Sequence, residues 1–120
     1  MNWKDSFSKG KELVLATSSN FGMPNANKVI SLGFIDDKIL IADCYMKNTL
    51  KNLKENGKVC MVSDCYRIKG NAKVSSIGKC FDRALGILSI QDKNLKLKNV
   101  IIVTVKEIFD LNECKVVSKF

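Results

Sequence analysis

The sequence predicts a small, mainly β protein of the α+β class, an antiparallel barrel of six strands with two short helices. Short apolar segments rich in Val, Ile and Leu recur along the 120 residues and are separated by polar turns. Two further segments carry apolar residues at helical spacing. The length suits one hydrophobic core, so residues 1–120 are expected to form a single domain. Closing the sheet removes the edges that such strands otherwise expose.

The first third of the chain is predicted to form three strands joined by short turns. Strands are expected at residues 13–17, at residues 25–35 and from Lys38 onward, with Gly33 marking a bulge. Residues 3–11 also contain the spacing of a short helix, which an internal glycine weakens. The short links between the strands indicate an antiparallel meander.

Residues 38–64 are predicted to form a strand, a polar turn, a short helix and a second strand. The continuous apolar run at residues 39–42 is typical of a strand buried on both faces. The helix is indicated by an apolar stripe at i, i+4 and i+7 with lysines on its other side, formed by Met46, Leu50 and Leu53. Gly57 is expected to stop this helix, and the next strand is expected at residues 58–62.

The remaining elements are two strands with a helix between them. Residues 66–74 alternate loosely and are predicted to form a strand that Gly70 interrupts. Residues 77–90 carry apolar side chains at helical spacing. Residues 100–105 give the strongest strand pattern in the chain, with an extension at residues 108–111.

Lys47, Asn48 and Thr49 lie where the buried strand gives way to the first turn of the helix. That turn presents free backbone N–H groups and the positive end of the helix dipole, which favour an anion such as phosphate. A lysine and a hydroxyl at the same place add hydrogen bonds to it. The alternative is a solvated lysine beside an Asn or Thr helix cap, which is the commoner arrangement for this spacing.

The composition is that of a cytoplasmic protein. No apolar run approaches the roughly 18 residues that a membrane helix needs. The N-terminal segment lacks the basic and then apolar pattern of a signal peptide. Five cysteines, an odd number without paired spacing, are expected to be free thiols in a reducing compartment.

The formal net charge of +8 comes almost entirely from lysines, which are spread along the chain among acidic residues. Such a charge attracts anionic ligands, nucleic acid or a membrane surface, but it is also typical of a solvated surface. Arg67 and Arg83 are the only arginines. The lack of clustered arginines and interleaved aromatics argues against nucleic-acid binding.

The absent motifs restrict the chemistry. With no histidine, Ser-His-Asp and Cys-His mechanisms and His-based metal sites are excluded. No C-x-x-C pair and no glycine-rich nucleotide loop is present, so no metal site is expected. Asp43, Tyr45 and Tyr66 are candidate acids or bases, although a structural role is favoured for each. Any redox chemistry would therefore come from a bound cofactor.

Three segments carry a family resemblance: LATSSNFGMPNANKV at residues 15–29, DCYMKNTLKNLKENGKVCMV at residues 43–62, and RIKGNAKV at residues 67–74. The first resembles the opening strand, G-x-P turn and second strand of the pyridoxamine phosphate oxidase-like flavin-binding split barrels. The second is similar to their K-T-x-x-N-L-x-x-N-x-x-V segment, and the third to their R-x-x-G-x-A strand. With the strands between them, the resemblance spans roughly residues 10–110.

The resemblance implies a split β-barrel, a homodimer and FMN bound in a groove at the dimer interface. It implies that the residues after G-x-P line the flavin, namely Asn27, Lys28 and Val29. The family's phosphate-binding pair falls on Lys47, Asn48 and Thr49. The residues implied to run along the isoalloxazine and ribityl chain are Asp43, Cys44, Tyr45 and Met46.

Two departures from the family pattern affect these expectations. The lysine that precedes the family's threonine is replaced by Asn48, so the positive charge near the phosphate must come from Lys47 or Lys28. The sequence given also lacks the arginine-rich C-terminal segment that binds substrate in true pyridoxamine phosphate oxidases. Cys44 is expected to be a small apolar filler, with a working thiol as the alternative.

Three functions are compatible with the sequence. The first is an FMN-binding protein, either a small flavin reductase or oxidoreductase or an electron carrier, with a small molecule or a protein as its redox partner. The second is a split barrel that binds another ligand, such as a deazaflavin or haem, with haem disfavoured because histidine is absent. The third is a basic nucleic-acid-binding barrel without enzymatic activity.

Overall fold

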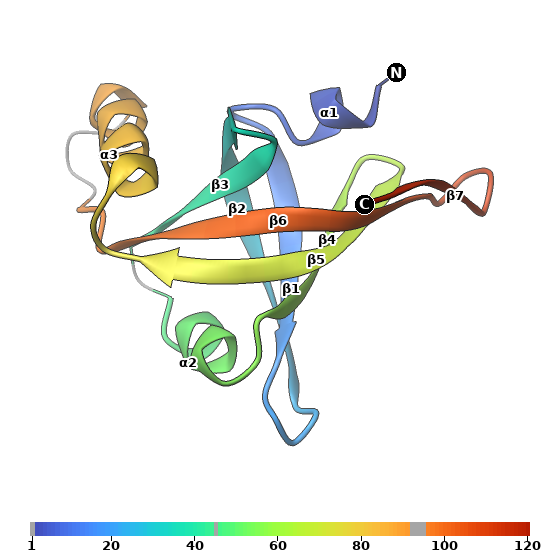
Figure 1. Ribbon diagram of the computed structural model, residues 1–120, viewed down its shortest axis with the longest axis horizontal. Helices are drawn as coiled ribbons and strands as arrows, with labels where there is room; N and C mark the ends of the chain where they lie inside the picture. The colour runs from blue at the N-terminus through green and yellow to red at the C-terminus, as the bar shows by residue number, and fades with distance from the viewer. Residues whose placement is uncertain (1, 45, 92–95) are drawn as a thin grey trace.

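The chain folds into one antiparallel sheet that curls into a barrel, with three helices around it (Figure 1). The computed structural model describes residues 2–44, 46–91 and 96–120. In chain order the elements are α1 (Trp3–Ser6), β1 (Glu12–Ser18), β2 (Pro24–Ile35), β3 (Lys38–Asp43), α2 (Asn48–Glu55), β4 (Lys58–Ser63), β5 (Tyr66–Ser75), α3 (Lys79–Gln91), β6 (Asn99–Asp110) and β7 (Lys115–Lys119).

The first six strands close the barrel. Neighbouring strands follow the order β3-β2-β1-β4-β5-β6-β7, and every pairing is antiparallel. β3 also pairs with β6, with Lys38 opposite Thr104 and Asp43 opposite Asn99, which joins the two ends of the six-stranded part. β7 extends away from the barrel as a hairpin with β6 (Figure 1). The predicted mainly β, six-stranded antiparallel barrel of the α+β class is confirmed.

The first three strands form the predicted meander, and its bulge lies at Gly33. β2 and β3 change register between Ser31 and Phe34. Gly33 lies within this irregular stretch with φ at 95°, in the left-handed region that glycine tolerates best. The predicted bulge is therefore confirmed.

β3 is buried on both faces, as its continuous apolar run predicts. Ile39 and Ile41 are fully buried in the core inside the barrel. Leu40 belongs to a second cluster, together with Ala84 of α3 and Val100 of β6. The strand is thus packed between the barrel interior and α3, which holds its C-terminal end in place.

The two longer helices pack against different strands. α2 contacts β1, β2 and β5, whereas α3 contacts β2, β3 and β6. In Figure 1 both lie toward the left-hand ends of β5 and β6. None of the helices in the described part of the chain is long and apolar enough to cross a membrane.

Gly70 does not interrupt β5, which runs through it with a register shift between Lys69 and Gly70. A Cβ at Gly70 would collide with the carbonyl oxygen of Thr104. The glycine is therefore needed because β5 and β6 approach each other closely at this bulge.

Gly57 follows the end of α2 as expected, but it does not act as a left-handed cap. The C-cap residue is Asn56, whose backbone is extended with φ at −149°. The Gly57 carbonyl accepts a hydrogen bond from the Ala72 N–H at 2.7 Å, which connects the segment to β5.

The sequence pattern does not indicate β7. Its apolar side chains remain largely exposed, 44% for Val116 and 43% for Val117. Because β7 pairs only with β6 and buries neither face, no alternation of apolar and polar residues marks it.

Candidate functional site

The end of β3 is fastened to the start of β6 by the buried carboxylate of Asp43. Its Oδ1 accepts a hydrogen bond from the Met46 backbone N–H at 2.8 Å, and its Oδ2 accepts one from Asn99 Nδ2 at 2.8 Å. The Asp43 carbonyl oxygen accepts a third from the Lys98 N–H at 3.0 Å. Asp43 therefore fixes the backbone that leads into α2, which is a structural role.

Thr49, in the first turn of α2, meets two asparagines of β2. Its Oγ1 accepts a hydrogen bond from Asn27 Nδ2 at 2.6 Å and a second from Asn25 Nδ2 at 3.2 Å. The threonine is fully buried, and both asparagines are half-buried. The fold thus joins Asn27 and Thr49, which lie 22 residues apart and both belong to the predicted cofactor site.

A second polar contact holds the same face of α2 on the barrel. Asn52 Nδ2 donates to Thr17 Oγ1 of β1 at 3.0 Å, and this pair is buried. Asn25, Asn52 and Thr17 are not among the site residues that the sequence predicts. Spacing alone marks two of them, since Asn25 shares a strand face with Asn27 and Asn52 shares a helix face with Thr49.

Lys47 lies on the opposite side of α2 from Thr49, because helical residues two apart do not face each other. It occupies the N-cap position with helical backbone angles, and its side chain forms no capping hydrogen bond. Asn48 is exposed at the first position of the helix. The alternative of an Asn or Thr cap is therefore not found, and no acid in the first turn compensates the helix dipole.

Lys28 points away from the Asn27–Thr49 pair, whereas Val29 shares the inner face of β2 with Asn27. Strand alternation places Lys28 on the outer face of β2, where its Nζ lies 3.4 Å from Glu12 Oε1 and both side chains are exposed. The Val29 side chain packs in the barrel core and is 5% exposed. The fold does not bring these side chains to Thr49, so their roles toward a ligand stay predictions.

The remaining residues predicted for the site or for acid–base chemistry differ in their burial. Cys44 is half-buried and forms no disulfide, and Met46 is half-buried beside Asp43. Tyr45 lies outside the described residues. Tyr66 is buried, and its pKa is raised, first by desolvation and then by neighbouring groups including Cys65, so it stays protonated at neutral pH. In the described part of the chain, no group of three or more Cys, Asp or Glu side chains could hold a metal ion.

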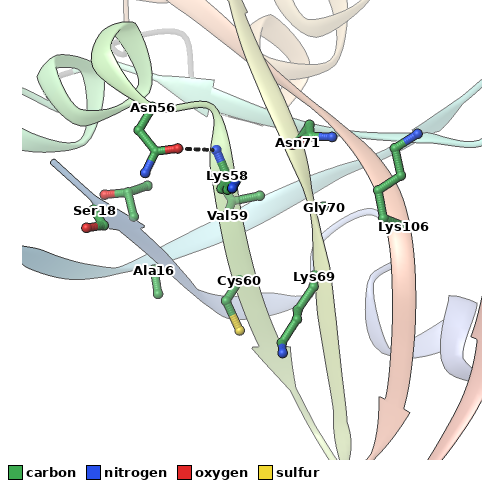
Figure 2. Close-up of a pocket in the computed structure, with 11 residues that line it drawn as sticks. Ala16, Ser18, Asn56, Lys58, Val59, Cys60, Lys69, Gly70, Asn71 and Lys106 are labelled. Carbon is green, nitrogen blue, oxygen red and sulfur yellow. Dashed lines mark hydrogen bonds between the residues drawn. The ribbon is translucent and has the colours of Figure 1, made fainter. Parts of the chain in front are cut away.

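A hollow of about 470 Å³ lies over β1, β4 and β5 near the C-terminal end of α2 (Figure 2). Three lysines line it, but Figure 2 shows Lys69 and Lys106 pointing in opposite directions, so their charges do not converge. Burial raises the pKa of the Cys60 thiol more than Arg67 and Lys69 lower it. The hollow therefore holds neither a focused charge nor a reactive thiolate at neutral pH.

The R-x-x-G-x-A segment contributes to packing rather than to the Asn27–Thr49 site. The Arg67 guanidinium lies 4.5 Å from the ring centroid of Phe109. Gly70 allows the close approach to β6, and Ala72 is buried in the core. Gly70 and Ala72 are thus explained by the barrel itself, whereas the buried Arg67 Nε has no hydrogen-bond partner among the described residues.

One relative in sequence is an uncharacterised protein of Methanocaldococcus jannaschii. It is 31% identical over 105 residues, which cover 81% of this chain and 70% of that protein.

Three solved structures illustrate the shared fold. HupZ of Group A Streptococcus has a TM-score of 0.79 at 21% identity, covering 89% of this chain and 90% of HupZ. An FMN-binding protein of Syntrophomonas wolfei has a TM-score of 0.71 at 22% identity, covering 98% and 82% of the two chains. HutZ, the heme storage protein of Vibrio cholerae, has a TM-score of 0.71 at 13% identity, covering 90% and 91%. At these identities the likeness concerns the fold alone.

The family model of pyridoxamine 5'-phosphate oxidase matches residues 3–112. This match includes all six barrel strands, and the chain therefore belongs to the pyridoxamine 5'-phosphate oxidase family, as its three sequence segments predict.

Proposed function

We propose that the protein is an FMN-binding flavoprotein that acts as a small oxidoreductase or as an electron carrier. The observation that carries the proposal is the hydrogen bond from Asn27 Nδ2 to Thr49 Oγ1 at the start of α2. It joins the two segments that the family resemblance assigns to the flavin and to its phosphate. Membership of the family and the fold shared with an FMN-binding protein support it.

The residues at this place suit the phosphate end of FMN. The first turn of α2 has no acidic residue and no side-chain cap, so its backbone N–H groups can face an anion. The Thr49 hydroxyl and the amides of Asn25 and Asn27 are held together. In the proposal, Lys47 at the N-cap position supplies positive charge from the other side of the helix start. Asp43 directs both carboxylate oxygens toward N–H donors of the protein.

When bound, FMN would supply reversible one- or two-electron chemistry, and the chain would bind and orient it. The proposal includes a homodimer that completes the flavin groove and a small molecule or protein as redox partner. The five thiols, none of them in a disulfide, suit a reducing cytoplasm.

Titration of the purified protein with FMN and with riboflavin, followed by absorption and fluorescence, tests the proposal. Thr49→Val and Lys47→Ala should weaken FMN about tenfold to a hundredfold, the effect of losing a charge-assisted hydrogen bond. Riboflavin has no phosphate, so its affinity should change little. Lys28→Ala tests for a compensating lysine, and Asn48→Lys should leave FMN binding unchanged or tighten it.

Lys119→Ala is the matched control, because it removes a lysine from β7, outside the barrel. Equal losses for FMN and riboflavin would remove the phosphate site from the proposal. Failure of the parent protein to bind either flavin, together with a Soret band on adding haemin, would instead favour haem. Haem would then need a Cys, Met or Tyr ligand, since the chain has no histidine.

A further inference from the structure

A cavity of about 400 Å³ lies on the outer side of α2, between this helix, the end of β3 and the segment that enters β6. Four of the seven described residues that line it are lysines: Lys47, Lys51, Lys54 and Lys98. Its volume falls in the range of small-ligand pockets. The cavity is therefore large enough for a ligand and strongly basic.

Three of the lysines share one face of α2. Lys47, Lys51 and Lys54 are spaced at i, i+4 and i+7, which stacks them one above another. Like charges at this spacing destabilise a helix, and positive charges near its N-terminus oppose the dipole. Lys47 and Lys51 thus disfavour the start of the helix, although Lys54 in the last turn suits the dipole. A residue that disfavours its own element is expected where it serves function rather than folding.

Within the described residues, no ion pair balances the charge of these three α2 lysines. None of the four ion pairs of the described residues includes Lys47, Lys51 or Lys54. Asp43 is the one acid among the described lining residues, and its fully buried carboxylate already accepts hydrogen bonds from Met46 and Asn99. An anion with several charges would remove the repulsion among the lysines.

We propose that this cavity binds the diphosphate group of a small ligand, the class that includes ADP and the pyridine dinucleotides. Lysines bind phosphate as point charges, so several of them suit an anion with several negative charges. The half-buried Met46 and Leu50 side chains offer an apolar wall for the ligand's base. Asp43, Met46 and Lys47 also belong to the predicted FMN site, whereas Leu50, Lys51, Lys54 and Lys98 do not. The inference goes beyond the FMN proposal because Lys51 and Lys54 lie on the outer face of α2, away from Thr49.

Calorimetric titration at low ionic strength with inorganic pyrophosphate, ADP and NADH tests the inference. Lys51→Ala and Lys54→Ala should each weaken ADP binding about threefold to tenfold, and the double variant more than tenfold. Neither residue belongs to the proposed FMN site, so FMN affinity should stay within about twofold. Tighter binding of ADP than of pyrophosphate would show that the apolar wall takes part, and equal binding would assign the site to the diphosphate alone.

Lys73→Ala on β5 and Lys119→Ala on β7 are matched controls that remove the same charge elsewhere, and circular dichroism checks that each variant folds. Equal losses in these controls would reduce the effect to net charge and overturn the inference. It would also be overturned if the parent bound none of the three ligands, if FMN displaced ADP, or if ADP binding depended on Thr49 instead of Lys51 and Lys54. Loss of FMN binding alone would count only against the flavin proposal.

Discussion

Asp43 shows how a single buried acidic residue can determine the geometry around a site. Its carboxylate is fully buried, which is costly unless donors surround it. Met46 and Asn99 provide these donors from the two segments that flank the cavity on the outer side of α2. The side chain therefore holds the end of β3, the entry to α2 and the start of β6 in one arrangement.

Asp43→Asn tests this role. The new amide would place N–H donors against a donor of Met46 or Asn99, so the free energy of unfolding should fall by about 2–3 kcal/mol. Urea denaturation measures the change. Glu55→Gln, the same type of substitution at an exposed position near the end of α2, should stay within about 0.5 kcal/mol. Similar losses in both variants would contradict a special role for Asp43.

At the scale of secondary-structure elements, hydrophobic spacing predicted where α2 lies in the chain. It did not predict which face of the helix packs against the barrel. The stripe of Met46, Leu50 and Leu53 predicts an apolar inner face, yet only Leu53 is buried. Thr49 and Asn52 fill the rest of the buried face. They can do so because partners on β1 and β2 satisfy their polar groups, and a pattern within the helix cannot reveal such distant partners.

Strands with a buried face were predictable, whereas strands without one were not. The apolar residues of β1 and the continuous apolar run of β3 marked these strands, and β3 buries both of its faces. β7 buries no face and carries no such pattern. From the sequence, Gly70 is expected to interrupt its strand. The fold shows instead that a glycine is needed there because β6 approaches β5 closely.

Two glycine substitutions distinguish a steric need for glycine from its ordinary cost in backbone entropy. Gly70→Ala should lower the free energy of unfolding by about 1–3 kcal/mol, because the added methyl group meets the Thr104 carbonyl oxygen and the strands must move apart. Gly86→Ala is the matched control in α3, where the methyl group meets nothing within 4 Å. It should raise stability by about 0.5–1 kcal/mol through helix propensity. Thermal or urea unfolding measures both, and a neutral Gly70→Ala would contradict the close packing at the bulge.

At the scale of the whole molecule, the fold brings together only part of the predicted cofactor site. Asn27 and Thr49 meet because β1, β2 and α2 pack against one another. Lys28 and Lys47 lie on other faces of their elements, a separation that follows from strand alternation and helical pitch once the partners are known. Sequence spacing predicts an anion site at the start of α2, but it could not assign the side chains there to one face.

We predict that the proposed homodimer forms through the outer face of β1, β2 and β4. Val14 is 36% exposed and Ile30 is 52% exposed, and Val62 lies opposite Val14 in the register. A second copy of the chain would cover these side chains, so light scattering should give twice the 13.4 kDa of one chain. Val14→Asp should shift the protein to the monomer, because a charge would be buried without a partner. Ile77→Asp, at an exposed apolar residue just before α3, should leave the dimer intact; a parent protein that stays monomeric with FMN present would contradict the proposal.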